Sequence, residues 1–408
     1  MNMTNLPPDW TIARLGEVSR VVAGQSPLSS TYNHDGQGYP FLQGKADFTR
    51  YFPKPTICCS KPSKIASKGS VLLSVRAPVG AVNVADQDYA IGRGLASINL
   101  TEGDNTFLFY LLLYNRPRLE ALGSGTTFQA INNADITNLK VAIPPLPDQC
   151  AIAHVLRTVQ QAREARQHEI ELERESKAAL MQRLFTHGTR GEPRKQTEIG
   201  EMPENWKVVR LGEISRVSSG GTPDRSQPSY WNGSIPWVKT GEIDYNTIIE
   251  TSEGITEEGL KNSSAKLYAP GTLLMAMYGQ GVTRGRVALL GIDAAINQAC
   301  AAIIASESVL SEYLFHLFAF SYDKIRNLGH GANQTNINAL IIKSIQVPLP
   351  TLPEQQEIAS MLCACDAKIE ALEREVDKLD ELFRALLEEL MTGRLSALLA
   401  TTTVAEGG

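Results

Sequence analysis

The chain has 408 residues and a formal net charge of −5 at pH 7, with 43% hydrophobic and 20% charged residues. This length predicts two to three domains, each large enough to bury its own core. The sequence contains no run of about 18 apolar residues that would mark a membrane helix. Its six cysteines fall in no spacing typical of a zinc site. We therefore expect a globular protein of the reducing cytoplasm, with neither membrane association nor a metal site.

Residues 1–147 are predicted to form a first globular domain that is repeated further along the chain. The segment 14–21 (RLGEVSRV) recurs at 210–217 (RLGEISRV), an offset of 196 residues, and Trp10 recurs as Trp206. The period is far longer than the roughly 20–50 residues of solenoid repeats. The sequence therefore predicts a duplicated domain whose second copy occupies residues 206–352.

The two copies share apolar, Gly and Pro positions but differ in the polar segments between them. Residues 43–47 (QGKAD) align with 239–244 (KTGEID), and residues 127–129 (TFQ) align with 333–335 (NQT). The functional interpretation of this pattern is that both copies keep one scaffold while their surfaces have been adapted separately. Neutral drift of surface loops is the alternative.

Each copy is followed by a long helical pattern, at 148–190 and 353–395. The second has apolar residues spaced mostly by three and four, which is typical of a coiled coil. The preceding segment 351–354 (TLPE) predicts a capping box with Pro in the first turn. Roughly 38 residues at 1.5 Å each predict a rod of about 55 Å.

The first helical segment differs from the second in its seam, the line of residues that faces the partner helix in a coiled coil. Arg163, Arg166, Glu173 and Lys177 stand where the second segment has apolar residues. A homodimer of the first helix would bury these charges at a cost of several kcal/mol each. Antiparallel pairing with the second helix lets the long stems lie over the apolar seam with their charged heads in water. In the alternative, each helix packs only on its own globule and leaves apolar stripes uncovered.

The predicted fold class is mixed α/β. Two homologous domains with β-rich cores are separated by two long antiparallel helices that form a coiled-coil spacer, and an approximate twofold axis relates the two halves. Residues 191–205 are predicted to be a linker and residues 396–408 a disordered tail. Such an object suits a target that repeats along a line, and duplex DNA, with a turn of about 34 Å, is the foremost candidate.

The net charge is spread unevenly over these segments. Residues 1–147 carry +3, residues 148–205 carry −1, residues 206–352 carry 0 and residues 353–408 carry −7. Each globule is thus neutral to slightly basic, and we expect partner subunits to supply much of the positive charge that DNA binding needs.

Side chains suited to DNA recognition occur in both copies. Arg makes bidentate hydrogen bonds to guanine, Asn and Gln make them to adenine, and Lys and Arg hold phosphates. The candidates in the first copy are Gln43, Lys45, Arg50, Arg76, Arg93, Thr127 and Gln129. Those in the second copy are Lys239, Arg284, Arg286, Gln298, Asn333 and Gln334. Arg284 and Arg286, which flank Gly285, are the first choice, and a structural or solvated role is the alternative for every candidate.

Several short motifs occur in the same order in both copies. They are Trp10 with 15–17 (LGE), the turns 24–27 (GQSP) and 220–223 (GGTP), the segments 143–149 (IPPLPDQ) and 347–356 (VPLPTLPEQQ), and the helix ends 180–188 (LMQRLFTHG) and 387–393 (LEELMTG). With this ordered set, the chain resembles the specificity subunits of Type I restriction-modification systems over nearly its whole length. The charged seam of the first helix is the one departure.

The resemblance implies that each globule is a target-recognition domain. It implies spacer helices that bind two methyltransferase subunits, with restriction subunits joining in the full complex. It also implies a bipartite, asymmetric site on double-stranded DNA and methylation of adenine at N6. S-adenosylmethionine, and ATP with Mg, would then be held by the partner subunits.

The sequence contains no motif of a catalytic site. An amino-methyltransferase needs an Asn/Asp-Pro-Pro-aromatic tetrapeptide and a Gly-rich cofactor turn, and neither occurs; a Gly-x-x-x-x-Gly-Lys-[Ser/Thr] phosphate loop is also missing. We therefore expect no catalytic residue, metal or cofactor on this chain. Two alternatives stay open: a self-contained adenine methyltransferase, and a bivalent protein scaffold that does not recognise DNA.

Overall fold

The computed structural model describes residues 6–123, 130–279, 282–328 and 336–397. The chain forms two compact units: unit 1 is Met1–Gln167 with Glu373–Gly408, and unit 2 is His168–Leu372. Two long helices, α5 (Leu146–His187) and α11 (Leu352–Met391), each contribute residues to both units. The mixed α/β fold that the sequence predicts is confirmed.

Unit 1 contains two main sheets. Four antiparallel strands form one of them, in the order β2 (Ser19–Ala23), β10 (Leu95–Leu100), β7 (Val71–Ser74) and β8 (Val82–Val84). The other has the order β3 (Tyr32–Asn33), β5 (Cys58–Cys59), β4 (Tyr39–Leu42), β9 (Tyr89–Ile91) and β6 (Ile65–Ala66). In this second sheet β4 and β9 run parallel. A separate antiparallel pair consists of β1 (Thr11–Arg14) and β11 (Lys140–Ile143).

Helix α2 (Asn105–Tyr114) lies in the core of unit 1 because it is apolar on all sides. Residues 107–112 (FLFYLL) are all buried, and Asp104 caps the first turn by accepting hydrogen bonds from the amides of Thr106 and Phe107. The remaining short elements are α1 (Leu15–Val18), η2 (Ser29–Thr31), η3 (Lys45–Asp47), α3 (Arg116–Leu122) and α4 (Asn133–Thr137).

Unit 2 repeats this order of elements, which confirms the predicted duplication. One sheet has the order β15 (Ser215–Ser219), β23 (Cys300–Ala305), β20 (Leu273–Ala276), β21 (Val287–Leu290) and β17 (Thr247–Ile248), and the other has the order β18 (Gly254–Ile255), β16 (Trp231–Val238), β22 (Ala294–Ile296) and β19 (Leu267–Tyr268). β14 (Lys207–Arg210) pairs with β24 (Gln346–Leu349). The shorter elements are α6 (Leu211–Ile214), η4 (Pro228–Tyr230), η5 (Thr240–Glu242), α7 (Glu257–Lys261), α8 (Ser311–Phe320), α9 (Tyr322–Arg326) and α10 (Ala339–Ser344).

Residues 191–205, which the sequence predicts to be a linker, contain a β-hairpin of β12 (Arg194–Thr197) and β13 (Gly200–Pro203). Lys195 Nζ donates to the backbone carbonyls of Glu204 and Trp206, both at 2.7 Å. This segment is therefore a folded part of unit 2. Of the predicted tail, residues 398–408 lie outside the described residues, whereas Ala397 is buried in the core of unit 1.

A buried glutamine in the first turn fixes each long helix to its globule. Gln149 Oε1 accepts from the Asp104 amide (3.0 Å), and Gln149 Nε2 donates to the Pro144 carbonyl (2.9 Å). Gln355 does the same in unit 2, with the amide of Leu310 (2.9 Å) and the carbonyl of Pro350 (3.0 Å). Because a buried amide must satisfy both its donor and its acceptor, each glutamine allows one orientation of the helix start.

Glu354, which the sequence predicts to close a capping box, has other partners. Its carboxylate is buried and accepts hydrogen bonds from Trp206 Nε1 (3.0 Å) and from the amide of Thr189 (3.3 Å). These contacts tie the start of α11 to the residues that follow α5 within unit 2.

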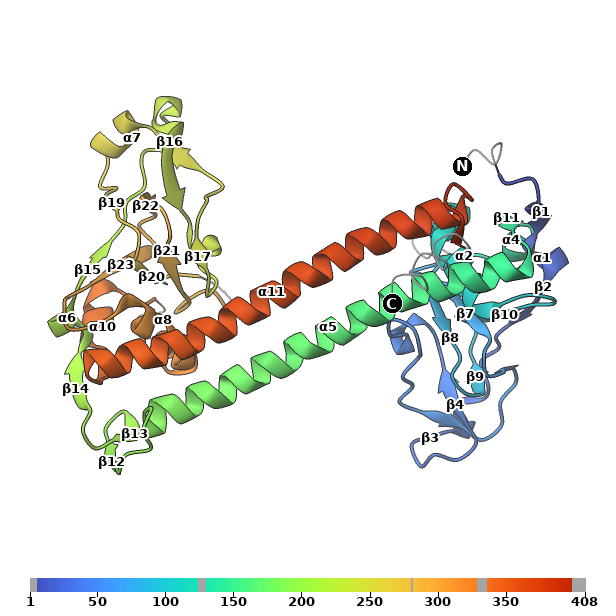
Figure 1. Ribbon diagram of the computed structural model, residues 1–408, viewed down its shortest axis with the longest axis horizontal. Coiled ribbons are helices and arrows are strands. Elements are labelled where there is room, and N and C mark those ends of the chain that lie inside the picture. Colours follow the sequence, from blue (N-terminus) through green and yellow to red (C-terminus); the bar gives the residue numbers. More distant parts are fainter. Residues whose placement is uncertain (1–5, 124–129, 280–281, 329–335, 398–408) are drawn as a thin grey trace, which may run out of the picture. The chain divides into compact units, whose positions relative to one another are not determined.

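In unit 1, opposite charges on α5 and α11 face each other. Arg163 on α5 pairs with Asp380 on α11 at 2.5 Å, and Arg166 pairs with Glu375 at 2.7 Å. Residue numbers rise along α5 as they fall along α11, so the helices are antiparallel here, and Figure 1 shows them side by side.

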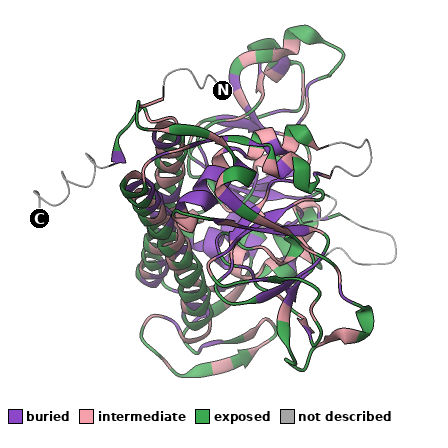
Figure 2. Ribbon diagram, turned by 90° about the vertical axis from the view of Figure 1, so that its right-hand side faces the viewer, coloured by how far each residue is buried: buried purple, intermediate pink, exposed green. Residues whose placement is uncertain are grey.

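The same arrangement continues in unit 2. Glu173 on α5 pairs with Lys368 on α11, and Lys177 pairs with Asp366. The apolar seam of α11 is buried, as the sequence predicts, at Ile369 and Leu372 in unit 2 and at Val376 in unit 1. The outer faces of both helices carry exposed residues (Figure 2).

The antiparallel pairing of the helices is thus confirmed. The prediction that the charged ends of the α5 side chains lie in water agrees with Arg166, whose side chain is 45% exposed. It does not agree with Arg163 and Lys177, whose side chains are partly buried at 26% and 18% exposed. Acidic residues of α11 lie within reach of each cation, so the charges are neutralised between the helices.

We expect the substitution Arg163→Glu to lower the free energy of unfolding by about 1–3 kcal/mol, because a carboxylate then faces Asp380 across a partly buried seam. Adding Asp380→Arg to the same chain restores the opposite pair and should recover most of the loss. Urea unfolding of the two single variants and the double variant gives the coupling between the sites. A coupling near zero would show that the pair does not stabilise the helices.

Candidate nucleic-acid interface

In each unit the ends of four strands meet at one surface, which we call the strand-end platform. In unit 1 it comprises residues 24–26, 43–45, 75–77 and 92–94, which follow β2, β4, β7 and β9. Backbone hydrogen bonds hold these segments to one another and to adjoining residues: Val75 N to Gly94 O (2.9 Å), Gly24 N to Leu95 O (2.9 Å), Gly92 N to Leu42 O (2.8 Å) and Ile131 N to Val75 O (3.0 Å).

Unit 2 has the same platform at residues 220–222, 239–241, 277–279 and 297–299. The equivalent hydrogen bonds are Gly220 N to Cys300 O (3.1 Å), Asn297 N to Val238 O (2.9 Å), Met277 N to Ala299 O (2.9 Å) and Ile337 N to Met277 O (3.1 Å). The backbone scaffold is therefore shared, and the side chains on it are free to differ.

The platform of unit 1 brings together four predicted DNA-contacting residues. Gln43, Lys45, Arg76 and Arg93 line a hollow of about 200 Å³ together with Ser26. All four of these side chains are exposed. They come from three separate segments of the chain, and only the sheet pairing places them side by side.

Two contacts hold the rim of this hollow in place. Ser26 Oγ accepts hydrogen bonds from the Arg93 amide (3.4 Å) and from Arg93 Nε (3.3 Å). Behind Gln43, the Asp47 carboxylate accepts from the Gln43 amide (3.1 Å). Burial raises the pKa of Asp47, against backbone hydrogen bonds from Gln43 and Gly44 that lower it.

A second, basic hollow of about 320 Å³ in unit 1 shares Lys45 with the first. It is also lined by Arg50, Arg116 and Arg163. Arg116 pairs with Glu120 at 2.7 Å. Within the described residues, Lys45 and Arg50 have no ion-pair partner, so their charge is available to a phosphate.

On the platform of unit 2, Gln298 is exposed and its Oε1 accepts a hydrogen bond from Thr222 Oγ1. Lys239 Nζ pairs with the Glu253 carboxylate at 2.9 Å, and Arg225 pairs with the same carboxylate at 2.6 Å. Hydrogen bonds from these two cations, Lys239 first, lower the pKa of Glu253. The charge of Lys239 is thus already compensated inside the unit.

Arg284 and Arg286 lie where the chain enters β21. Arg284 is 9% exposed, and Gly285 has a left-handed backbone (φ 85°) and packs against α9. The Arg286 guanidinium pairs with Asp244 and lies 5.7 Å from the ring centre of Tyr245. Both cations are therefore engaged within unit 2, and a role for them in DNA recognition stays a prediction.

Four candidates, Thr127, Gln129, Asn333 and Gln334, lie outside the described residues. Sequence reasoning also missed three residues of the platforms: Ser26, Thr222 and Tyr278. Ser26 and Thr222 occupy the same position of the turns 24–27 and 220–223, so the repeat alignment held the signal. Tyr278, which is 40% exposed, takes the position of Arg76.

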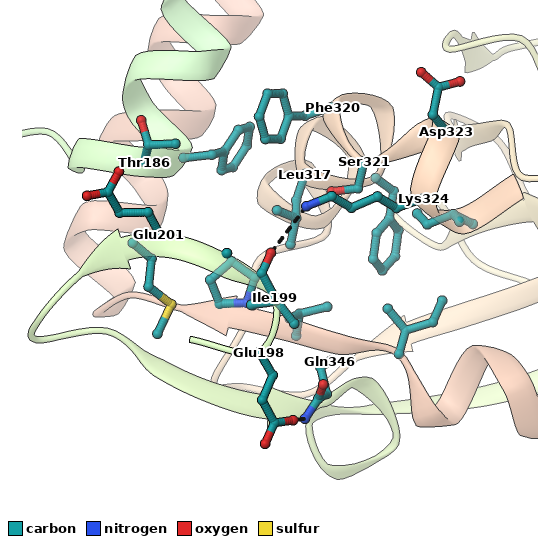
Figure 3. Close-up of a pocket in the computed structure, with 18 of the residues that line it drawn as sticks. Thr186, Glu198, Ile199, Glu201, Leu317, Phe320, Ser321, Asp323, Lys324 and Gln346 are labelled. Atoms are coloured by element: carbon teal, nitrogen blue, oxygen red, sulfur yellow. Dashed lines mark hydrogen bonds between the residues drawn. The ribbon is translucent and has the colours of Figure 1, made fainter. Parts of the chain in front are cut away.

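A larger hollow of about 800 Å³ lies in unit 2 between the end of α5, the β12–β13 hairpin, α8, α9 and β24 (Figure 3). Side chains such as Leu317 and Phe320 line it. Lys324 Nζ donates to the Ile199 carbonyl (3.2 Å), and a further bond joins Gln346 to Glu198 on the same hairpin. These contacts fasten the hairpin to the globule, and no predicted DNA-contacting residue lines this hollow.

The described residues contain no group of three or more His, Cys, Asp and Glu side chains arranged to hold a metal ion. None of the helices in the described part of the chain has the length and apolar character needed to cross a bilayer. What the platforms offer is hydrogen-bond donors, acceptors and positive charge on a rigid backbone, which is the chemistry of recognition.

Comparison with known proteins gives one consistent result. The family model described as the Type I restriction modification DNA specificity domain matches the chain twice, over residues 7–174 and 203–381. The type I restriction enzyme MjaVIII specificity subunit of Methanocaldococcus jannaschii is 24% identical over 413 residues, covering 97% of this chain and 95% of that protein. The putative MjaX specificity subunit of the same organism is 43% identical over 185 residues, covering 44% of each chain.

Two solved structures share the fold. The S subunit of a Type-I restriction-modification system from M. genitalium superimposes with a TM-score of 0.66 at 18% identity, covering 95% of this chain and 96% of that one. A chain from a study of complex assembly and conformational transition of the type I R-M system has a TM-score of 0.58 at 19% identity, covering 96% of this chain and 100% of that one.

We expect Gly24→Ala to destabilise unit 1 by about 1–3 kcal/mol, because overpacking of this size forces the backbone to move. A Cβ at Gly24 would lie 2.2 Å from the Gly92 carbonyl oxygen, whereas a Cβ at Gly44, on the same platform, meets nothing within 4 Å. Gly44→Ala is therefore the matched control, expected to change stability by less than about 0.5 kcal/mol. Thermal unfolding compares the two, and equal effects would contradict the close packing of the strand ends.

Proposed function

This chain belongs to the Type I restriction modification DNA specificity family, and from that premise we propose that its two recognition domains read the two halves of one bipartite DNA site. Each half is read by one strand-end platform. The chain thereby directs methylation of adenine at N6, and restriction, to that site, while partner subunits carry out the chemistry.

The observation that carries this proposal is the pair of equivalent platforms with different side chains. Hydrogen bonds to base edges require donors and acceptors on a fixed backbone, because a small displacement breaks a bidentate contact. The platforms share their backbone hydrogen bonds, yet Arg93 in unit 1 corresponds to Gln298 in unit 2 and Arg76 corresponds to Tyr278. Two such surfaces recognise two different short sequences, so the site is asymmetric.

The distribution of charge supports a need for partners. Unit 1 presents Lys45 and Arg50 without ion-pair partners in the described residues, whereas Lys239 and Arg286 of unit 2 are paired with carboxylates. Neutralising only a few phosphates gives weak binding at physiological salt. We therefore propose that two methyltransferase subunits, and restriction subunits in the full complex, add basic surface around the DNA.

We propose that the chain itself is not catalytic. The relatives that match it are named specificity subunits, and the platforms carry no nucleophile with a neighbouring base. S-adenosylmethionine, and ATP with Mg, would then be held by the partner subunits. The cytoplasm, where bacterial or archaeal DNA lies, is the compartment that this function requires.

The test of this function is to map modified adenines in the host genome with and without the gene. We expect deletion to remove methylation at one asymmetric, two-part motif, and the intact gene to restore it. The purified chain with S-adenosylmethionine alone should methylate nothing, because the methyltransferase is a separate subunit. Turnover by the chain alone would support the self-contained enzyme, and an unchanged methylation pattern would support the protein scaffold.

Lys45 is expected to hold a phosphate, so Lys45→Ala should weaken binding of the reconstituted complex to all duplexes alike. Removing one phosphate contact also lowers the slope of log K against log salt by about 0.9. Lys68→Ala is the control, since Lys68 is exposed and precedes the opposite end of β7. Fluorescence anisotropy across a salt series measures both, and an unchanged slope for Lys45→Ala would remove this residue from the interface.

A further inference from the structure

Arg93 and Gln298 hold the same position in the two platforms. Each is the second residue of a tight turn, closed by a hydrogen bond from Leu95 N to Gly92 O (3.1 Å) in unit 1 and from Cys300 N to Asn297 O (2.9 Å) in unit 2. Each also contacts a hydroxyl from the turn that follows β2 or β15, which is Ser26 in unit 1 and Thr222 in unit 2. The scaffold is thus the same, and a hydroxyl supports each exposed side chain, accepting from Arg93 in unit 1 and donating to Gln298 in unit 2.

The supporting hydroxyl leaves the recognition atoms of both side chains available. Ser26 accepts a hydrogen bond from Nε of Arg93, and none of the described residues hydrogen-bonds to the two terminal nitrogens, which form the fork that binds guanine O6 and N7. Thr222 uses one lone pair of Gln298 Oε1. The second lone pair and Nε2 remain, which are the acceptor and the donor that match adenine N6 and N7.

The difference in charge between Arg93 and Gln298 distinguishes a contact with a base from a contact with a phosphate. A phosphate is the same at every step of the duplex, so a phosphate contact favours a cation in both copies. Gln298 is neutral, and a neutral amide at this supported position suits a base edge. Arg and Gln are the side chains that make bidentate contacts with different bases.

Building on the proposed function, we propose that this position determines base specificity. Arg93 reads a guanine in one half-site, and Gln298 reads an adenine of the other half-site that is not itself methylated. Ser26 and Thr222 are positioning residues that hold each side chain in the orientation its base requires.

The experiment exchanges the two side chains in the complete complex and maps the modified adenines in cells that lack the wild-type gene. We expect Arg93→Gln to change one guanine of one half-site to adenine in the methylated motif. Gln298→Arg should change one adenine of the other half-site to guanine. In both cases the remaining bases and the spacing stay unchanged.

Binding of the reconstituted complex to duplexes with each base pair changed in turn decides the case in which a variant methylates no motif. Against the wrong base at its position, the wild type should discriminate on the order of 10- to 100-fold. Arg93→Gln and Gln298→Arg should each lose that discrimination at one position only. Equal weakening on every duplex would assign the position to a phosphate and overturn the inference.

Matched controls come from the repeat itself. Arg20 and Arg216 are equivalent exposed residues of β2 and β15, outside both platforms, so Arg20→Gln and Arg216→Gln make the same charge change as Arg93→Gln. Gln196→Arg on β12 adds the same charge as Gln298→Arg. All three should keep the wild-type motif.

The two proposals fail differently. A wild-type complex that marks no two-part site overturns the proposed function and this inference with it. A wild-type motif that survives both Arg93→Gln and Gln298→Arg overturns the inference alone. A motif that changes equally in the control variants also overturns it.

Discussion

Charge complementarity between α5 and α11 is the constraint on which the other features depend. The seam of α5 carries cations and a glutamate, and α11 presents an opposite charge to each of them, beside its own apolar residues. In a pair of identical α5 helices these partners would be missing, and partly buried like charges cost free energy. The unequal helices therefore favour pairing with each other over pairing of two copies of α5.

The long helices matter for recognition because each is fixed to a globule. Gln149 and Gln355 use both ends of a buried amide to set the first turn of a helix against the globule that precedes it. The strand-end platform belongs to the same globule and is held by backbone hydrogen bonds. Rigid elements thus support the side chains of the platform, as the proposed bidentate contacts require.

The duplication conserves backbone contacts and varies surface chemistry. Gly24 and Gly220 allow the turns to approach a neighbouring carbonyl oxygen, so the close packing of the strand ends is kept in both copies. The side chains on the two platforms differ in charge, size and hydrogen-bonding pattern. Near its platform, unit 1 has Lys45 and Arg50 without ion-pair partners in the described residues, whereas unit 2 pairs Lys239 and Arg286 internally.

The sequence by itself determined the duplication, the two long helices, the mixed fold and the family resemblance, because these follow from local periodicity and from the repetition of ordered motifs. It also selected Gln43, Lys45, Arg76 and Arg93, which the structure places around one hollow. Only the tertiary structure decided that Arg284 is buried, that residues 191–205 fold as a hairpin, and that Ser26 supports Arg93. The burial of Arg284 and the contact between Ser26 and Arg93 depend on segments that meet across long stretches of chain. The hairpin pairs locally, but Lys324 and Gln346, more than 120 residues further on, attach it to the globule. Residue type alone does not identify such long-range partners.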